Sequence, residues 1–220
     1  AILFVSFSVF VEGFLDAYNL FERSRYWVIP GLVAIPMTFI IATSGIDLSV
    51  GSIVAMCGIA LGMLYNDAHW PIAAAILAAV LAGVGAGAFN GVVSSYLRIP
   101  PLVATLATMA LFRGVAMGLS QARSISNFPS GFLWLSQGDL LGVPISGAEK
   151  AYVPAPALAL ALVTVAGWII LRRTWIGRFT ECIGANETAA EFAAVTVRGL
   201  KCALYAAMGG VCGVGALYNT

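Results

Sequence analysis

Long stretches without charged side chains constrain this chain more than any other feature of its sequence. Tyr26–Ile46 and Ala151–Leu171 are each 21 residues long and uncharged, enough helix to cross the roughly 30 Å hydrocarbon core of a bilayer. Other apolar runs are Ala1–Val11, Leu48–Asn66, Pro71–Leu97, Leu102–Ser120 and Cys202–Thr220. Only 10% of residues are charged, against about 25% in soluble domains. We therefore expect an all-α, polytopic transmembrane helix bundle with about seven spans.

The runs also predict the organisation of the chain, which we treat as one transmembrane domain over residues 1–220. Ala1–Val11 is too short to span and is expected to be the tail of a first span. The chain begins without Met and stops just after an apolar run, so it is expected to be a fragment. Pro71–Leu97 is longer than the bilayer core requires, so this run must tilt or break, with Asn90–Gly91 the expected position of a break.

Several kinds of chemistry find no support in the sequence. The net charge of +1 gives no case for nucleic-acid binding, and the single histidine, His69, lies in a short turn. The cysteines show no Cys-x-x-Cys pair and are Cys57, Cys182, Cys202 and Cys212. We expect no catalytic residues, no metal and no cofactor. No phosphate-binding Gly-x-x-x-x-Gly-Lys-Ser/Thr motif is present, because Lys150 precedes Ala and Lys201 precedes Cys. Any ATP hydrolysis must therefore occur on a separate subunit.

The segment 172–201 carries charges of both signs between two membrane-length runs, so it must protrude into water. Asn186 is suited to cap a short helix, Glu187 lies where the helix dipole favours a negative charge, and alanines follow. About two turns of helix are marginal alone in water, so something must dock against it. An apolar surface is expected at Ala190, Phe192, Ala193 and Ala194. The helix lies either on its own lipid surface or against a soluble partner.

A second informative stretch is Gly45–Ser52, which holds a carboxylate between two apolar runs. A charge within the membrane is costly, so Asp47 must cap, pair or face a cavity. In one interpretation Asp47 and Ser49 cap a helix that opens at Leu48, with Gly45 making the turn. In the other, the helix is broken and its free backbone groups border a substrate path. The two are compatible.

Four other polar side chains lie within the apolar runs and could line such a path. Asn90 could hydrogen-bond between helices or touch a solute. Arg113 could reach the membrane surface or face the path. The candidate path residues are Asp47, Ser49, Asn90, Thr105, Thr108 and Arg113.

Glycine pairs and basic residues predict packing and orientation. Gly-x-x-x-Gly pairs place both glycines on one helix face and predict close helix contacts; they are Gly58/Gly62, Gly83/Gly87, Gly87/Gly91, Gly114/Gly118 and Gly209/Gly213. The side that contains Asp47, Arg98 and the segment 172–201 carries six Lys and Arg residues, against four on the other side. The side with the excess is expected to be cytoplasmic.

Two motifs resemble the sugar-type permeases of bacterial ABC importers, the ribose, xylose, galactose, rhamnose and autoinducer-2 group. The first resembles their cytoplasmic coupling loop and comprises Thr174, Gly177–Arg178, Ile183–Gly184, Asn186–Glu187 and Ala189–Ala190. The second is the Gly45–Ser52 stretch, and Pro101, Val103–Leu106 and Arg113–Gly114 also follow the family pattern. The family usually has glycine where this chain has Ala185 and Ala194. The resemblance also implies further C-terminal spans beyond Thr220, as in full-length members of the family.

The resemblance implies a function and a set of partners. The chain is expected to be a permease subunit in a bacterial inner membrane, forming the path for a monosaccharide or similar small solute. Its expected partners are ABC ATPase subunits, a second permease subunit, a solute-binding protein and the lipid membrane. The residues implied to couple it to the ATPase are Gly177, Arg178, Gly184, Asn186, Glu187, Ala189 and Ala190. The alternative from the residues is an ion-coupled secondary transporter, for which only Asp47 and Arg113 are candidate buried charges.

Overall fold

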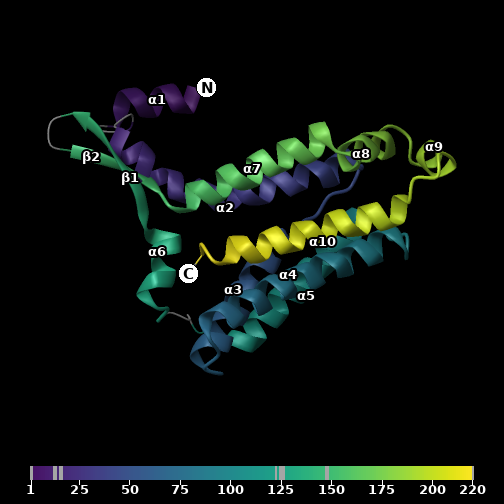
Figure 1. The fold of residues 1–220 in the computed structure, drawn as a ribbon, viewed down its shortest axis with the longest axis horizontal. Helices are drawn as coiled ribbons and strands as arrows, with labels where there is room; N and C mark the ends of the chain where they lie inside the picture. The colour runs from purple at the N-terminus through teal and green to yellow at the C-terminus, as the bar shows by residue number, and fades with distance from the viewer. Residues whose placement is uncertain are drawn as a thin grey trace.

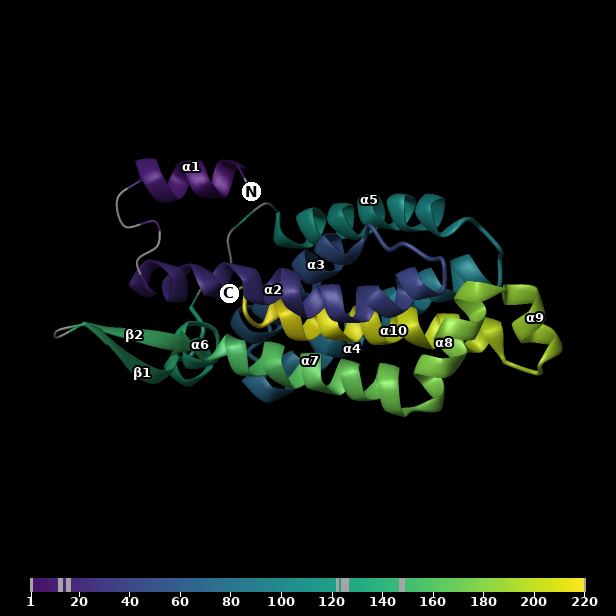
Figure 2. The ribbon, with the colours of Figure 1, turned by 90° about the horizontal axis from the view of Figure 1, so that it is seen from above.

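The computed structural model describes residues 2–11, 14, 17–121, 123, 127–146 and 149–219, and it is predominantly helical. Figures 1 and 2 show an elongated bundle, with a β-hairpin at one end and, at the other, a hook formed by the short helices of residues 175–192. The helices are α1 Ile2–Phe10, α2 Ala17–Ala42, α3 Val50–Asn66, α4 Ile72–Ser95, α5 Pro101–Ser120, α6 Ser130–Gln137, α7 Pro156–Arg173, α8 Trp175–Ala185, α9 Glu187–Phe192 and α10 Val197–Ala216. The hairpin strands are β1 Asp139–Ser146 and β2 Glu149–Pro154.

Within the described residues, five helices are long and apolar enough to cross a membrane: α2 over Arg23–Ala42, α4, α5, α7 and α10. The all-α bundle is therefore confirmed, but the expected number of about seven spans is not reached. At 17 residues, α3 measures about 26 Å along its axis. It nevertheless packs inside the bundle against α4, α5 and α10. The nine residues of α1 lie at the edge of the described structure (Figure 1).

The most extensive helix contact joins α4 and α10, which lie side by side in both views (Figures 1 and 2). Their backbones meet at glycines. A Cβ atom added to Gly83 would lie 2.3 Å from the carbonyl oxygen of Gly209, and one added to Gly87 would lie 2.1 Å from that of Tyr205. Only glycine allows so close an approach. The predicted glycine contacts on α4 and α10 are therefore present.

Two expectations about the apolar runs are wrong. A Cβ added to Gly114 or Gly118 would meet no atom within 4 Å, so this pair makes no close helix contact in the described structure. The helix α4 also runs unbroken through Asn90 and Gly91. The reason for a glycine at position 91 is packing, because an added Cβ would lie 2.7 Å from the Cα of Cys202.

The buried core lies between α2, α3, α4 and α10, where large apolar side chains such as Leu32, Ile53 and Met208 are fully enclosed. In contrast, α7 contacts the bundle mainly through α2 and leaves most of its apolar surface exposed. In a membrane that exposed surface faces lipid or another helix.

The connection between α5 and α7 contains α6 and the antiparallel β1–β2 hairpin, neither of which interrupts the helical bundle. Arg25 on α2 fixes this connection, since its guanidinium forms an ion pair with Asp139 and donates to the carbonyl oxygen of Gln137 at 2.6 Å. Figure 1 places the hairpin at the opposite end of the bundle from α8 and α9.

Candidate functional site

The segment after α7 turns back on itself through α8, which the sequence did not reveal as a helix. Glycines make this turn possible. A Cβ added to Gly177 would lie 2.0 Å from the carbonyl oxygen of Leu171, where α8 folds against the end of α7. One added to Gly184 would lie 1.9 Å from the carbonyl oxygen of Ala42, at the end of α2. Both motif glycines therefore fix the position of α8, while Arg178 points outward and is exposed.

Asn186 separates α8 from α9 and caps the second of them, as predicted. Its side-chain oxygen accepts a hydrogen bond from the backbone N–H of Ala189 at 3.0 Å, which satisfies one of the free donors at a helix start. Glu187 lies in the first turn of α9 and accepts a hydrogen bond from Lys201 of α10, with 2.6 Å between Oε2 and Nζ. This ion pair joins the short helix to a long helix of the bundle.

The predicted apolar surface on α9 is divided between two faces. Ala190 is buried against the bundle, whereas the side chain of Phe192 is 89% exposed. Ala193 and Ala194 are exposed beside it, and Ala194 adopts a φ of 60°, in the left-handed region that favours glycine. The tip of α9 therefore presents the aromatic ring of Phe192 to its surroundings.

The link between α2 and α3 has no regular secondary structure, and its residues alternate between exposed and buried, with Gly45, Asp47 and Ser49 buried. The interpretation in which Asp47 and Ser49 cap a helix at Leu48 is wrong in detail, because α3 begins at Val50 and Ser49 makes no side-chain cap. The left-handed turn residue is Ser44, with a φ of 60°, rather than Gly45. Gly45 instead fits against the hydroxyl group of Tyr205, which would lie 2.9 Å from an added Cβ.

Asp47 is only 1% exposed, and hydrogen-bond donors from within the protein surround its carboxylate. One carboxylate oxygen accepts the backbone N–H of Ser49 at 2.8 Å and its hydroxyl at 2.6 Å. The side-chain amide of Asn90, from α4, reaches the other oxygen at 3.4 Å and donates to the Ser49 hydroxyl at 2.7 Å. These donors replace water around a buried charge.

The cluster ties α4, α5 and α10 to the irregular link. Thr105 on α5 approaches the carbonyl oxygen of Ile46 at 3.3 Å, and the hydroxyl of Tyr205 on α10 approaches the same oxygen at 3.4 Å. Irregular backbone is stable at membrane depth only when protein or water satisfies its polar groups. Here Thr105 and Tyr205 approach the backbone oxygen of Ile46, while Asn90 donates to the side chains of Asp47 and Ser49.

The structure thus brings together Asp47, Ser49, Asn90 and Thr105, and it places Thr108 one turn further along α5, where its hydroxyl lies 3.3 Å from the carbonyl oxygen of Thr105. Arg113 is exposed on α5 and takes no part in the cluster. Tyr205 and Lys201 complete the two sites but carried no sequence signal, because their contacts form only once α10 packs against the link at Ile46 and against α9.

A bundle with five described helices long and apolar enough to cross a membrane, and with a buried polar cluster around Asp47, is that of a multi-pass membrane protein. The family model described as "Branched-chain amino acid transport system / permease component" matches residues 19–220. The chain therefore belongs to this family of permease components. No solved structure matches it.

Curated relatives support the same assignment. The ribose import permease protein RbsC of Bacillus subtilis (strain 168) is 36% identical over 211 residues, which cover 94% of this chain and 62% of the relative. The autoinducer 2 import system permease protein LsrD of Klebsiella pneumoniae subsp. pneumoniae is 34% identical over 209 residues, 92% of this chain and 60% of the relative. The chain therefore spans about three fifths of the length of these relatives.

Proposed function

We propose that this chain forms the larger part of the membrane subunit of an ABC importer, and that α8 and α9 receive a separate ATPase. The observation that carries the proposal is α9 itself, a short capped helix at the end of the bundle on which the side chain of Phe192 is 89% exposed. A helix of six residues is not stable alone. It is held here by the Glu187–Lys201 pair and by α8, which Gly184 places against α2. The Phe192 face is left available to a partner.

The solute is proposed from the relatives, which are named as import permeases for ribose and for autoinducer 2. A small hydroxyl-rich solute fits a protein whose buried polar side chains, among the described residues, are hydroxyls together with the amide of Asn90 and the carboxylate of Asp47. The proposed assembly also contains a second permease subunit and an external solute-binding protein. It lies in a bacterial inner membrane, with α8 and α9 on the cytoplasmic side because Arg172, Arg173 and Arg178 gather there.

The contacts suggest how movement of α9 would reach the bundle in an alternating-access cycle. A displacement of α8 and α9 acts on α2 through the backbone contact at Gly184 and on α10 through the Glu187–Lys201 pair. Because α10 and α4 touch backbone to backbone, they can respond together as one unit. In this scheme α3, which is shorter than the five candidate spans, crosses the membrane together with the irregular link before it, so that six helices span.

The test uses the full-length permease, co-expressed and purified with the ATPase encoded beside it. The variant Phe192→Ser removes the exposed ring without touching the bundle, and Trp134→Ser on α6 is the matched control at the opposite end, where the ring is 53% exposed. We expect ATPase recovery to fall at least tenfold in Phe192→Ser only, as for loss of a central aromatic contact worth about 2 kcal/mol.

Recovery of the ATPase with Phe192→Ser at the parent level would contradict the assignment of α9 as the docking helix. Solute uptake by the purified permease alone, driven by an ion gradient, would favour the secondary-transporter alternative. Asp47 would then be the first residue to study.

A further inference from the structure

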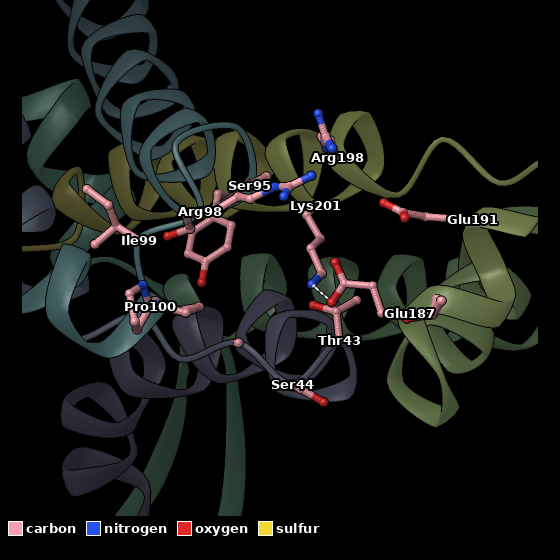
Figure 3. Close-up of a pocket in the computed structure, with 15 residues that line it drawn as sticks. Thr43, Ser44, Ser95, Arg98, Ile99, Pro100, Glu187, Glu191, Arg198 and Lys201 are labelled. Atoms are coloured by element: carbon pink, nitrogen blue, oxygen red, sulfur yellow. Dashed lines mark hydrogen bonds and ion pairs between the residues drawn. The ribbon is translucent and has the colours of Figure 1, made fainter.

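A cavity of about 520 Å³ lies at the hook end of the bundle, bounded by α9 on one side and by the ends of α4, α5 and α10 on the other (Figure 3). Its lining includes the turn after α2, the α4–α5 turn and the first two turns of α10. The contacts at Gly184 and between Glu187 and Lys201, described above, do not explain why a cavity of this size lies here.

Positive charge exceeds negative charge around this cavity. Arg98, Arg198 and Lys201 line it, against Glu187 and Glu191. Figure 3 shows Lys201 reaching across toward Glu187, the one ion pair that the described lining residues form. Arg98 and Arg198 have no carboxylate within ion-pair distance in the described part of the chain, so two guanidinium groups remain available to an anion.

Uncharged donors at the same place add to this potential. The hydroxyl of Ser95, a residue 8% exposed that borders the cavity, is buried and makes no hydrogen bond within the described residues. Buried hydroxyls are normally paired. In addition, α10 begins at the cavity without a side-chain cap, so the positive end of its dipole faces this region. The start of α5 adds only its dipole, because Pro100 and Pro101 carry no N–H.

We propose that this cavity binds a phosphate group, held by Arg98, Arg198 and Lys201 beside the buried Ser95 hydroxyl at the end of α4. Guanidinium and ammonium groups together with helix N-termini are the donors that recognise phosphate in proteins. Glu187 competes with the phosphate for Lys201, so occupancy of the cavity loosens the contact between α9 and α10. Glu191 adds a second carboxylate at the rim, which disfavours ligands of high negative charge.

Two sources could supply the phosphate: a small phosphate ester in solution or the headgroup of an anionic lipid, since the cavity lies where the bundle would meet the membrane surface. The chemistry of recognition is the same for both. The experiment therefore uses the full-length permease in nanodiscs of two compositions, one of phosphatidylcholine alone and one containing phosphatidylglycerol.

In phosphatidylcholine nanodiscs, binding of inorganic phosphate is measured by calorimetry and by phosphorus NMR line broadening. In the second composition, retention of phosphatidylglycerol is measured by native mass spectrometry. The variants Arg98→Met and Lys201→Met remove cavity charges and keep the aliphatic stems. Arg173→Met, an exposed arginine at the same end that does not line the cavity, is the matched control. Thermal melting confirms that each variant is folded.

We expect each cavity variant to weaken phosphate or phosphatidylglycerol binding about tenfold, the loss of one charged hydrogen bond, while Arg173→Met changes it less than twofold. Glu187→Gln should strengthen binding about threefold, because it frees Lys201. Binding in the first composition identifies a soluble phosphate, and binding only in the second identifies a lipid. Absence of saturable binding in both, or equal losses in Arg98→Met and Arg173→Met, would overturn the proposal. Transport is not measured, so the outcome is separate from that of the proposed function.

Discussion

The contact between α4 and α10 gives a prediction whose magnitude follows from the geometry. In Gly87→Ala, the new methyl group would lie 2.1 Å from the carbonyl oxygen of Tyr205, whereas ordinary contacts begin at 3.4 Å. The two backbones must therefore separate locally by about 1.3 Å. The separation also loosens the neighbouring contacts at Gly83 and Gly209. Overpacking of this kind costs about 1–3 kcal/mol, and the upper part of that range is expected because backbone atoms cannot rotate away.

The matched control lies two residues earlier on the same helix. Gly85 is exposed, and an added Cβ would meet no atom within 4 Å. Gly85→Ala should be neutral or stabilising by about 0.5–1 kcal/mol, because alanine favours helix more than glycine does. The assay is reversible unfolding of the full-length permease in mixed detergent micelles, with helix content as the readout. Equal stability of Gly87→Ala and Gly85→Ala would refute backbone contact between α4 and α10.

Three further predictions follow from the sites. Asp47→Ala leaves the donors of Ser49 and Asn90 without an acceptor and should destabilise the protein by about 3 kcal/mol in the same unfolding assay, with Asp47→Asn less severe; no change would contradict the buried cluster. Asn186→Ala removes the cap of α9 and should cost about 1 kcal/mol, visible as faster amide exchange confined to the residues of α9. An impermeant maleimide should label exposed Cys182 from the cytoplasmic face and leave buried Cys57 and Cys212 unmodified; labelling of Cys182 from the opposite face would reverse the proposed orientation.

The sequence predicted those features that depend on local chemistry. Membrane-length apolar runs predicted the long helices, because a segment in lipid must satisfy its own backbone hydrogen bonds. Asn186 followed by Glu187 and alanines predicted the start of α9, because capping involves only the next few residues. Gly83 and Gly87 predicted a close helix contact, although their partner, α10, could not be identified from spacing alone.

The features that were missed depend on tertiary contacts. The helix α8 lies in a charged segment, and what holds it is the approach of Gly184 to Ala42, more than 140 residues away along the chain. The sequence predicted a helix break at Gly91, but α4 continues through this position, and the glycine there allows close packing against the backbone of Cys202. Asp47 appeared to be a helix cap because its partner Asn90 lies on another helix, 43 residues later.

The kinds of contact in the bundle indicate where this subunit can move. Between α4 and α10 the backbones touch at Gly83, Gly87 and Gly209, so sliding there would force main-chain atoms together and is strongly resisted. The connections of α9 to the bundle are weaker than this backbone contact. Ala194, which follows α9, adopts a left-handed conformation, and the Glu187–Lys201 pair is partly exposed, with the Glu187 side chain 51% accessible. Such a pair contributes only about 0.2–1 kcal/mol. Binding energy from a partner at Phe192 could therefore reposition α9 easily, while α4 and α10 respond together as a rigid pair.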